Sequence, residues 1–223
     1  MRRLRGFGLV EALLALSLGV IVIMAGSRLF ITAVKTWQTQ VAATRLQEDA
    51  RLALMRLSRD IRMSGMFGCL RTEAITFADV ATAEAFARPV VVNRDPAGNL
   101  RSLALLVSEA GALSGAPNWT LLTDCLTYAE VKAGEHAAGA GQFALPIRQQ
   151  VYRVEDGQLL LSSAGSSAVL IEQVARLEVE VSPDVGDPAL IQGIHLLLTL
   201  RDTQSNVREQ TYRLSTALRN RLS

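Results

Sequence analysis

The residue with the clearest chemical purpose is Glu11, a carboxylate inside the apolar run from Phe7 to Ser27. As a helix rising about 1.5 Å per residue, this run of 21 residues spans roughly 30 Å, the thickness of a bilayer's hydrocarbon core. An acid at the centre of a membrane helix costs about 2.5–3.5 kcal/mol, so such groups are functional candidates and need a cationic partner. The alternative interpretation is structural, because Glu11 is close to the start of the run, where the positive end of the helix dipole stabilises it.

Side chains that could carry catalysis are few. His136 and His195 fall in a predicted loop and a predicted strand, and neither belongs to an HExxH or CxxC motif that would bind a metal. The glycines from Gly134 to Gly141 lack the strand and helix that flank a phosphate-binding loop, and no Gly-x-Ser-x-Gly motif occurs. We therefore expect no enzyme, and no metal or other cofactor.

Basic residues precede the apolar run. Arg2, Arg3 and Arg5 favour a cytoplasmic N-terminus, which places the rest of the chain on the other side of the membrane. A cleaved secretory signal peptide has a similar layout, and residues 25–27, Ala-Gly-Ser, would suit its cleavage site. Against that interpretation, a carboxylate early in the apolar core is unusual, and the helical pattern continues past Ser27 without a break.

The start of the chain resembles the class III signal of type IV prepilins. The matching features are a short basic leader, residues 1–6, that ends in Gly6, followed by Phe7 and by Glu11 as the fifth residue of the mature chain. The resemblance implies that a prepilin peptidase cuts between Gly6 and Phe7 and N-methylates Phe7. It also implies that Glu11 pairs with the freed amine of a neighbouring subunit during assembly, where a low dielectric strengthens the attraction.

A second stretch is similar to the PilW-type minor pilins of type IV pili. It comprises residues 46–54, 59–65 and 68–69, in which an Arg-Asp-Ile-Arg run precedes a small-residue turn and a cysteine. This resemblance implies a type IV pilin-like fold, and a subunit that helps prime pilus assembly and sits at or near the fibre tip, with roles in twitching motility and cell adhesion. The implied partners are the major pilin, other minor pilins, the prepilin peptidase, the inner-membrane assembly platform, membrane lipid before assembly and, as a further candidate, a tip adhesin.

The implied location is the inner membrane, with a single pass and the globular domain in the periplasm, and later the pilus fibre at the cell surface. Two other functions share these features. A minor pseudopilin of a type II secretion system has the same leader, helix and α+β domain, and a monomeric membrane-anchored binding or sensory domain would keep its leader. Loss of the leader removes three of the 23 basic residues against 21 acidic ones, which changes the formal net charge from +2 to −1. No nucleic-acid partner is therefore expected.

Beyond the membrane segment, residues 7–28, the sequence predicts an α+β fold in which the long helix continues. Apolar residues at helical spacing recur through residues 29–65, which form an amphipathic half with ion pairs such as Arg56/Asp60 on its outer side. Residues 66–223 are expected to form a globular antiparallel β-sheet domain with long loops, and the amphipathic half is available to cover the apolar face of this sheet.

The predicted strands follow residue 100, and Asp156-Gly157 between two of them is a strong hairpin signal. Segments 70–100 and 111–146 give no clear pattern, although part of 72–88 is compatible with a short helix. The predicted strands are residues 101–108, 151–155, 158–163, 174–182, 193–202 and 207–218.

Cys69 and Cys125 are the two cysteines of the chain. A domain exported to an oxidising compartment usually keeps such a pair bonded, so we predict a structural disulfide between them. If the two thiols were free instead, intermolecular bonds would be the alternative.

Overall fold

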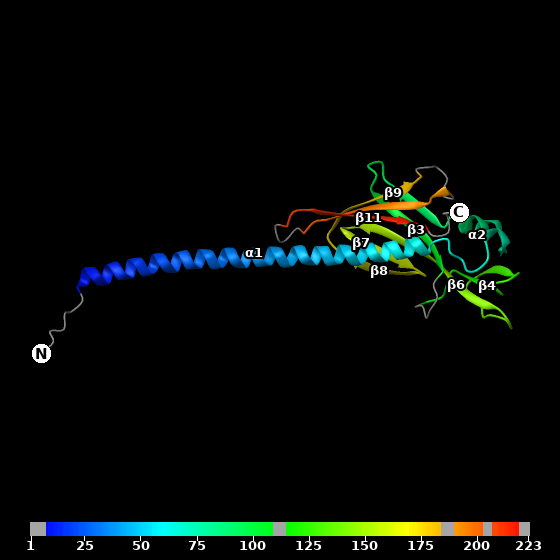
Figure 1. Cartoon of the computed structure of the whole chain (residues 1–223), viewed down its shortest axis with the longest axis horizontal. Helices are drawn as coiled ribbons and strands as arrows, with labels where there is room; N and C mark the ends of the chain where they lie inside the picture. The colour runs from blue at the N-terminus through cyan, green and yellow to red at the C-terminus, as the bar shows by residue number, and fades with distance from the viewer. Residues whose placement is uncertain (1–7, 109–114, 184–189, 203–206, 219–223) are drawn as a thin grey trace.

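The computed structural model describes residues 8–108, 115–183, 190–202 and 207–218 of the 223 in the chain. Its first element is α1, Leu9–Met63, which runs without a break for 55 residues, or roughly 80 Å at about 1.5 Å per residue. This continuity confirms the predicted long helix, and it follows from a sequence with no proline before Pro89. In Figure 1, α1 forms a rod whose N-terminal half projects away from the rest of the protein.

The described strands form two sheets. The larger has eight strands in the order β1-β5-β4-β6-β3-β2, with β7 paired to β6 and β8 paired to β7, and the smaller has the order β11-β10-β9. All of these pairs are antiparallel except β1 with β5. The strand bounds are β1 Thr76–Phe77, β2 Val90–Arg94, β3 Leu100–Ser108, β4 Trp119–Thr123, β5 Ala129–Ala133, β6 Phe143–Glu155, β7 Gln158–Ser163, β8 Ser166–Ile171, β9 Val174–Ser182, β10 Gly193–Leu200 and β11 Gln210–Ala217.

The strands predicted after residue 100 are present, and together with α1 they confirm the α+β class. The hairpin between β6 and β7 is also confirmed, because Asp156 and Gly157 both have positive φ angles, 49° and 73°, as a tight two-residue turn requires. β6 begins at Phe143 rather than at Val151. The sequence did not predict a strand over residues 143–150, because Pro146 lies among them and a proline inside a run argues against a strand.

The two segments without a clear pattern contain several short elements. They include α2, Val80–Ala87, as well as β1, β2, β4 and β5. Asp79 caps α2, because its side chain accepts the N–H of Thr82 at 2.7 Å, and the structure thus decides in favour of a short helix within 72–88, which the sequence left open. Strands of two to five residues are too short to show a clear alternation of apolar and polar side chains. Their conformation therefore depends on the strands with which they pair.

Apolar side chains gather in two cores rather than under a single helix. The first core packs the second half of α1 against β3, β7, β9 and β10. The second lies beyond the end of α1, where the tilted rings of Phe67 and of Phe86 in α2 pack with centroids 4.5 Å apart against β4, β5 and the start of β6. The prediction that α1 covers the apolar face of the sheet is confirmed only for the first core.

α1 ends where the backbone leaves the helical region. Ser64 is extended, and Gly65 has a φ of +79°, which a residue with a Cβ rarely adopts. The Ser64 hydroxyl donates to the carbonyl of Pro89 at 2.8 Å, and the Gly65 N–H donates to the carbonyl of Leu106 in β3 at 3.1 Å. These bonds attach the end of the helix directly to the larger sheet.

Candidate functional site

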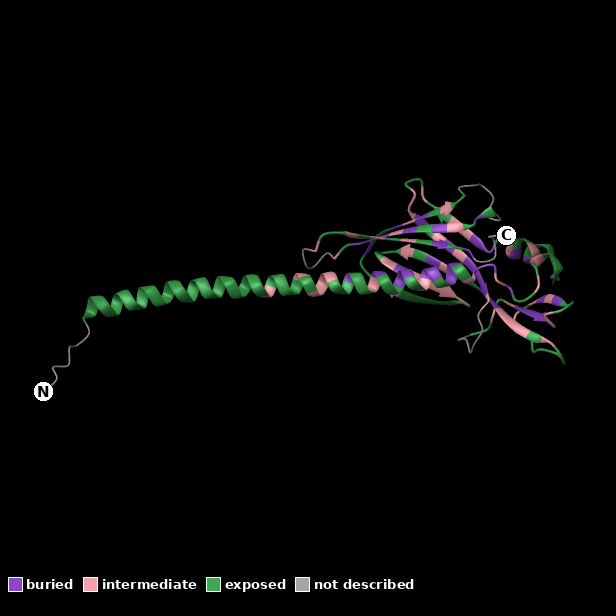
Figure 2. Cartoon of the chain, viewed as in Figure 1, coloured by how far each residue is buried: buried purple, intermediate pink, exposed green. Residues whose placement is uncertain are grey.

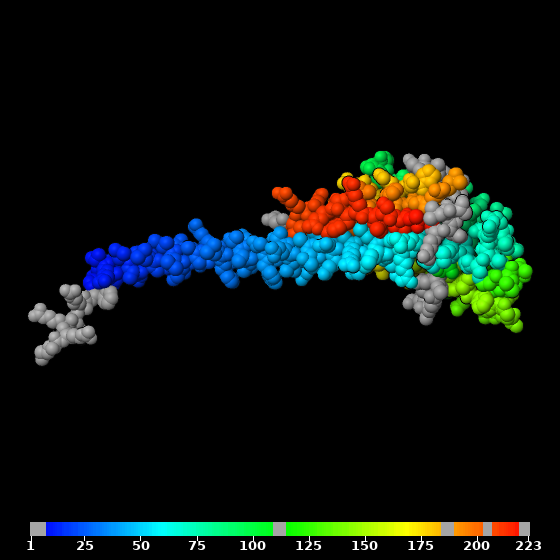
Figure 3. Space-filling model, viewed as in Figure 1, coloured from blue at the N-terminus to red at the C-terminus, as the bar shows by residue number. Residues whose placement is uncertain are grey.

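The first half of α1 is an apolar surface of membrane length. Every residue from Gly8 to Ala33 is exposed, and an 18-residue window of the helix has a mean hydropathy of 2.4 with none of it buried. Figure 3 shows this half as a bare rod, whereas the second half lies against the domain. Soluble monomers rarely expose a contiguous apolar surface of this size. By length and composition, the helix can therefore serve as a single-pass membrane anchor.

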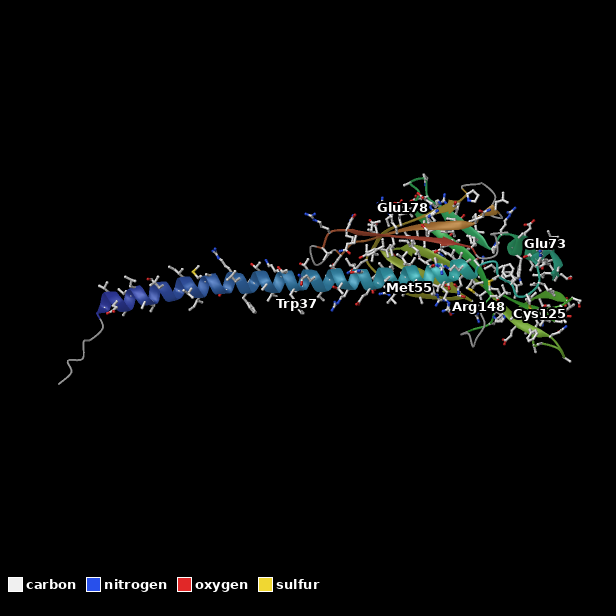
Figure 4. The ribbon with its side chains drawn as sticks, in the orientation of Figure 1. Trp37, Met55, Glu73, Cys125, Arg148 and Glu178 are labelled. Atoms are coloured by element: carbon white, nitrogen blue, oxygen red, sulfur yellow. A yellow bond between two sulfur atoms is a disulfide. The ribbon has the colours of Figure 1, made fainter. Side chains whose placement is uncertain are left out.

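The helix begins to pack on the domain later than the sequence predicted. Phe30 and Trp37 are 70% and 64% exposed, although both belong to the half that was predicted to pack on the sheet. Burial begins at Leu46, and Figure 2 shows it spreading over the helix from there toward the sheet. Figure 4 shows Trp37 on the uncovered stretch. The buried residues of α1 are Leu46, Ala50, Ala53, Leu54, Leu57, Ser58, Asp60 and Ile61.

Glu11 lies in the first turn of α1, whereas Gly6 and Phe7, the predicted processing site, lie outside the described residues. Unpaired N–H groups at this end of the helix give it a positive potential, which favours a carboxylate. The next charged residue of α1 is Arg28, about 26 Å further along the axis. None of the ion pairs among the described residues includes Glu11. A cation for this acid must therefore come from the residues before Gly8 or from another molecule.

Hydroxyl side chains on the exposed helix bond back to the helix itself. The Ser17 hydroxyl donates to the carbonyl of Leu14 at 2.8 Å, and the Thr32 hydroxyl donates to the carbonyl of Arg28 at 2.9 Å. Such bonds satisfy a hydroxyl without water. Ser17, in the middle of the apolar half, is thus compatible with a lipid environment.

At the junction of helix and sheet, a buried acid joins α1 to β6. Tyr152 is fully buried and donates its hydroxyl to Oδ2 of Asp60, and Arg56 donates its Nε–H to the same oxygen from 2.8 Å. Burial, followed by the negative charge of Asp60, raises the pKa of Tyr152, which therefore remains a donor. The hydrogen bond to Asp60 also raises the pKa of Arg56.

The prediction that Asp60 lies on the outer side of α1 is wrong. Asp60 is 7% exposed. Leu57, three residues before Asp60, and Ile61, the residue after it, are both fully buried. The position of Asp60 along the helix therefore indicated the face that packs on the core. The residue type pointed the other way, because an acid four residues after an arginine is typical of a solvated helix surface.

Further bonds fix the rotation of α1 about its own axis. The buried hydroxyls of Ser58 on α1 and Thr216 on β11 lie 3.0 Å apart, and Ser64 is bonded to Pro89 as described above. With the Asp60–Tyr152 bond, these contacts attach α1 to both sheets. Because α1 is one continuous helix, they also set the direction in which Glu11 faces relative to the domain.

At the end of the protein far from the N-terminus, Cys69 and Cys125 form a disulfide, with Cα atoms 5.2 Å apart, as predicted. Figure 4 shows Cys125 in this region. The neighbouring Asp124 accepts the N–H groups of Tyr128, Leu126 and Thr127 at 2.8–2.9 Å. These hydrogen bonds, that of Tyr128 first, hold the pKa of Asp124 well below its ordinary value. The loop beside the disulfide is therefore shaped by one carboxylate.

The two histidines lie apart from these features. His195 is exposed on β10 with its Nδ1 2.8 Å from the Ser215 hydroxyl, and the Nε2 of His136 lies 3.0 Å from the carbonyl of Ala133. Among the described residues, no three histidine, cysteine, aspartate or glutamate side chains cluster closely enough to hold a metal ion.

Comparisons with protein-family models, curated proteins and solved structures find no match to this chain.

Proposed function

We propose that this protein is a PilW-type minor pilin of a type IV pilus, with a pilin-like fold, that helps prime pilus assembly and sits at or near the fibre tip. The observation that carries the proposal is the first half of α1, a fully exposed apolar helix whose one early charge is Glu11. A simple membrane anchor needs only this span. Here the helix continues without a break into a half that packs on an α+β domain, as a filament subunit requires.

The exposed half of α1 is stable in two environments. In lipid, its apolar surface is removed from water at a gain of about 25 cal/mol per Å². In a bundle of similar helices the same surface stays out of water, so transfer from membrane to fibre exposes little apolar area. Neither environment is available to the isolated chain in water, so this surface has to be covered by lipid or by other helices.

Glu11 would set the stagger between subunits. We propose that it pairs with the freed amine of Phe7 on a neighbouring subunit, because no cation among the described residues is in reach. Opposite charges attract strongly at low dielectric and short range, so the pair favours one axial offset between helices. The bonds of Asp60 and Ser58 add orientation, since they fix which way Glu11 faces relative to the domain.

In this proposal the globular domain lies in the periplasm before assembly, which agrees with a bonded cysteine pair. The processing partner is the prepilin peptidase, acting between Gly6 and Phe7. The assembly partners are the inner-membrane platform, the other minor pilins and the major pilin, with a tip adhesin as a further candidate.

Mass analysis of the N-terminus, on protein purified from its native host, tests the proposal directly. The mature chain should begin with N-methyl-phenylalanine at Phe7. Retention of residues 1–6 would refute the proposal and favour a monomeric anchored domain.

Glu11→Leu tests the assembly step. Membrane insertion should be retained, since removing an acid from an apolar span costs nothing there, while surface pili counted by electron microscopy should be lost. Ser17→Leu is the matched control, because it replaces a polar residue of the same span without removing a charge, and it should leave piliation normal. Normal pili in the Glu11→Leu strain would contradict the proposed charge pairing.

Deletion of the gene separates the pilus from the type II secretion alternative. Loss of surface pili and twitching supports a minor pilin. Normal pili combined with failure to release folded exoproteins would assign the protein to the secretion system instead.

A further inference from the structure

We propose that residues 28–37 of α1, the interface segment, lie between lipid and water and tilt the helix in one direction. The aromatic side of this segment leans into the lipid, and its cationic side meets the anionic phosphates of the bilayer surface. The domain is then held on the side of α1 that faces away from the membrane. The proposal requires α1 to be a membrane anchor, but it requires neither cleavage after Gly6 nor assembly into a pilus.

The exposed apolar surface of α1 is longer than one upright membrane span. Phe30, Ile31 and Trp37, all beyond the first apolar run, are 70%, 54% and 64% exposed. The helix is about 33 Å long from Leu9 to Ile31 and about 42 Å long from Leu9 to Trp37, against roughly 30 Å of hydrocarbon. A helix whose apolar surface is longer than the hydrocarbon core tilts, because tilting keeps that surface in lipid.

Aromatic and cationic residues occupy opposite sides of the interface segment. Phe30 and Trp37 are seven residues apart, about two turns, so they lie on one side of the helix. Arg28 and Lys35 are also seven residues apart, and each precedes an aromatic residue by two positions, which is more than half a turn. All four side chains are exposed. One side of the segment is therefore aromatic, and the other side is positively charged.

The cationic side is also the side on which the domain packs. Leu46, the first buried residue of α1, follows Arg28 by 18 residues, or about five turns, and faces the same way. Trp37 precedes Leu46 by nine residues, or about two and a half turns, and faces the opposite way. Because α1 is continuous, a tilt toward Trp37 keeps the domain away from the bilayer. A tilt toward Arg28 would bring β11, which lies beside α1 in Figure 1, toward the headgroups.

The charges of the uncovered helix fit an anionic surface. Residues 12–47 contain no acid, and their charged residues are Arg28, Lys35 and Arg45. None of the ion pairs among the described residues includes any of these three cations. Arg28 directly follows the apolar run, at headgroup depth, and Lys35 lies about 10 Å further along the axis. A tryptophan near cations at the end of a span is typical of the membrane–water interface, so the occupant of this surface is the anionic bilayer.

Tryptophan fluorescence of the full chain in phosphatidylglycerol vesicles tests the depth of Trp37. Lipids with brominated acyl chains quench a tryptophan that lies in the bilayer and spare one that lies in water. Trp119, the other tryptophan, belongs to the second core, and Trp37→Phe leaves its signal alone. The difference between the two proteins therefore reports Trp37, whose signal brominated lipid should reduce at least about twofold. An unquenched Trp37 would overturn the proposal, whether water or a second protein helix surrounds it.

Two relocated tryptophans test the direction of the tilt. In a Trp37→Phe background, Thr32→Trp places the probe on the cationic side, four residues after Arg28. Ala33→Trp places it on the opposite side, four residues before position 37. Both positions are exposed, so near-ultraviolet circular dichroism of the domain should match that of the background protein.

The two sites differ by about 1.5 Å along the axis, so an upright helix would hold the probe slightly deeper at position 32 than at position 33. The proposed tilt reverses this order, and brominated lipid should quench the Ala33→Trp protein at least about twofold more strongly than the Thr32→Trp protein. Equal quenching, or stronger quenching of the Thr32→Trp protein, would overturn the proposed direction of tilt.

The double variant Arg28→Gln/Lys35→Gln tests the cationic side. Electron spin resonance of spin-labelled lipids measures the preference of the protein for phosphatidylglycerol over phosphatidylcholine, and this preference should fall at least about twofold in the double variant. Arg45→Gln is the matched control, because Arg45 lies about 25 Å beyond Arg28 and its loss should leave the preference unchanged. Equal preference in the wild type and the double variant would overturn the proposed contact with anionic phosphates.

These measurements use one purified protein in vesicles. Their outcome does not depend on the prepilin peptidase or on other pilus subunits, so failure of the proposed tilt and failure of the proposed minor-pilin function are distinguishable. A chain that keeps residues 1–6 in its native host and still shows the predicted quenching order would refute the minor pilin and support the tilted anchor.

Discussion

Tyr152→Phe removes one hydrogen bond from the junction of helix and sheet without changing the shape of the core. The phenylalanine ring fills the same volume, so no cavity forms. What is lost is the bond from a fully buried hydroxyl to the carboxylate of Asp60, and bonds to charged groups contribute about 1.5–3 kcal/mol. Asp60 keeps its bond from Arg56, so the acid is not left unpaired. We expect the free energy of unfolding to fall by about 2 kcal/mol.

Asp60→Ala should cost more than Tyr152→Phe. It removes the same bond and also leaves the Tyr152 hydroxyl buried without an acceptor, which adds about 1–3 kcal/mol. The Arg56 side chain is 41% exposed and returns to water, so its loss of a partner adds little. We expect about 3–4 kcal/mol for the single variant. The double variant should be less destabilised than the sum of the two, by about 3 kcal/mol, because each substitution removes the same contact and phenylalanine also removes the hydroxyl that Asp60→Ala leaves unpaired.

Urea unfolding of the full chain in detergent micelles, followed by near-ultraviolet circular dichroism, measures these differences. Tyr128→Phe is the matched control, since it makes the same chemical change at an exposed tyrosine whose hydroxyl donates to Glu130, and it should cost less than about 0.5 kcal/mol. If Tyr152→Phe is as neutral as this control, or if it and Asp60→Ala are additive, the junction does not hold α1 as we have argued.

Three other variants examine the part of the domain beyond α1. Replacing Cys69 and Cys125 by serine opens a connection between residues 56 apart and should lower the free energy of unfolding by about 4 kcal/mol, whereas an unchanged urea midpoint would show that the bond is dispensable. Asp124→Ala should lower the melting temperature near neutral pH. Because the folded pKa of Asp124 is depressed, its contribution is present above the ordinary value of 3.8 and declines as the pH falls below it, so the difference from wild type should shrink in acid; a gap that widens in acid would contradict this sign. Phe86→Ala should cost about 3–5 kcal/mol, since this ring is 1% exposed and packs on two other phenylalanines and a tryptophan, and a loss below about 1 kcal/mol would mean that the second core is not tightly packed.

The features that the sequence predicted correctly are local ones. The continuity of α1 depends on the absence of proline, and its apolar half depends on composition alone. The hairpin at Asp156-Gly157 depends on two residues that tolerate positive φ angles. The pairing of Cys69 with Cys125 was predicted because the chain has two cysteines and its domain is expected to lie in an oxidising compartment. Each of these features depends on a short stretch of chain or, for the disulfide, on the number of cysteines.

Other features depend on which residues meet across the fold. β4 and β5 have five residues each, and they are strands because β6 and the β1 edge offer them partners. The second core exists because Phe67 and Phe86, well apart in sequence, come together beyond the end of α1. The position of β8, paired with β7 off the main path of the sheet, is likewise a property of the sheet order, which no local pattern encodes.

By itself, then, the sequence determined that this chain begins with an apolar helix of membrane length carrying one acid, and that an α+β domain follows. Only the tertiary structure decided that Asp60 is buried, where Tyr152 and Arg56 satisfy it, and that α1 stays uncovered as far as Leu46. The physical reason is that hydrophobic length and backbone periodicity act within one segment, whereas the burial of a charge depends on a partner that folding brings from more than ninety residues away.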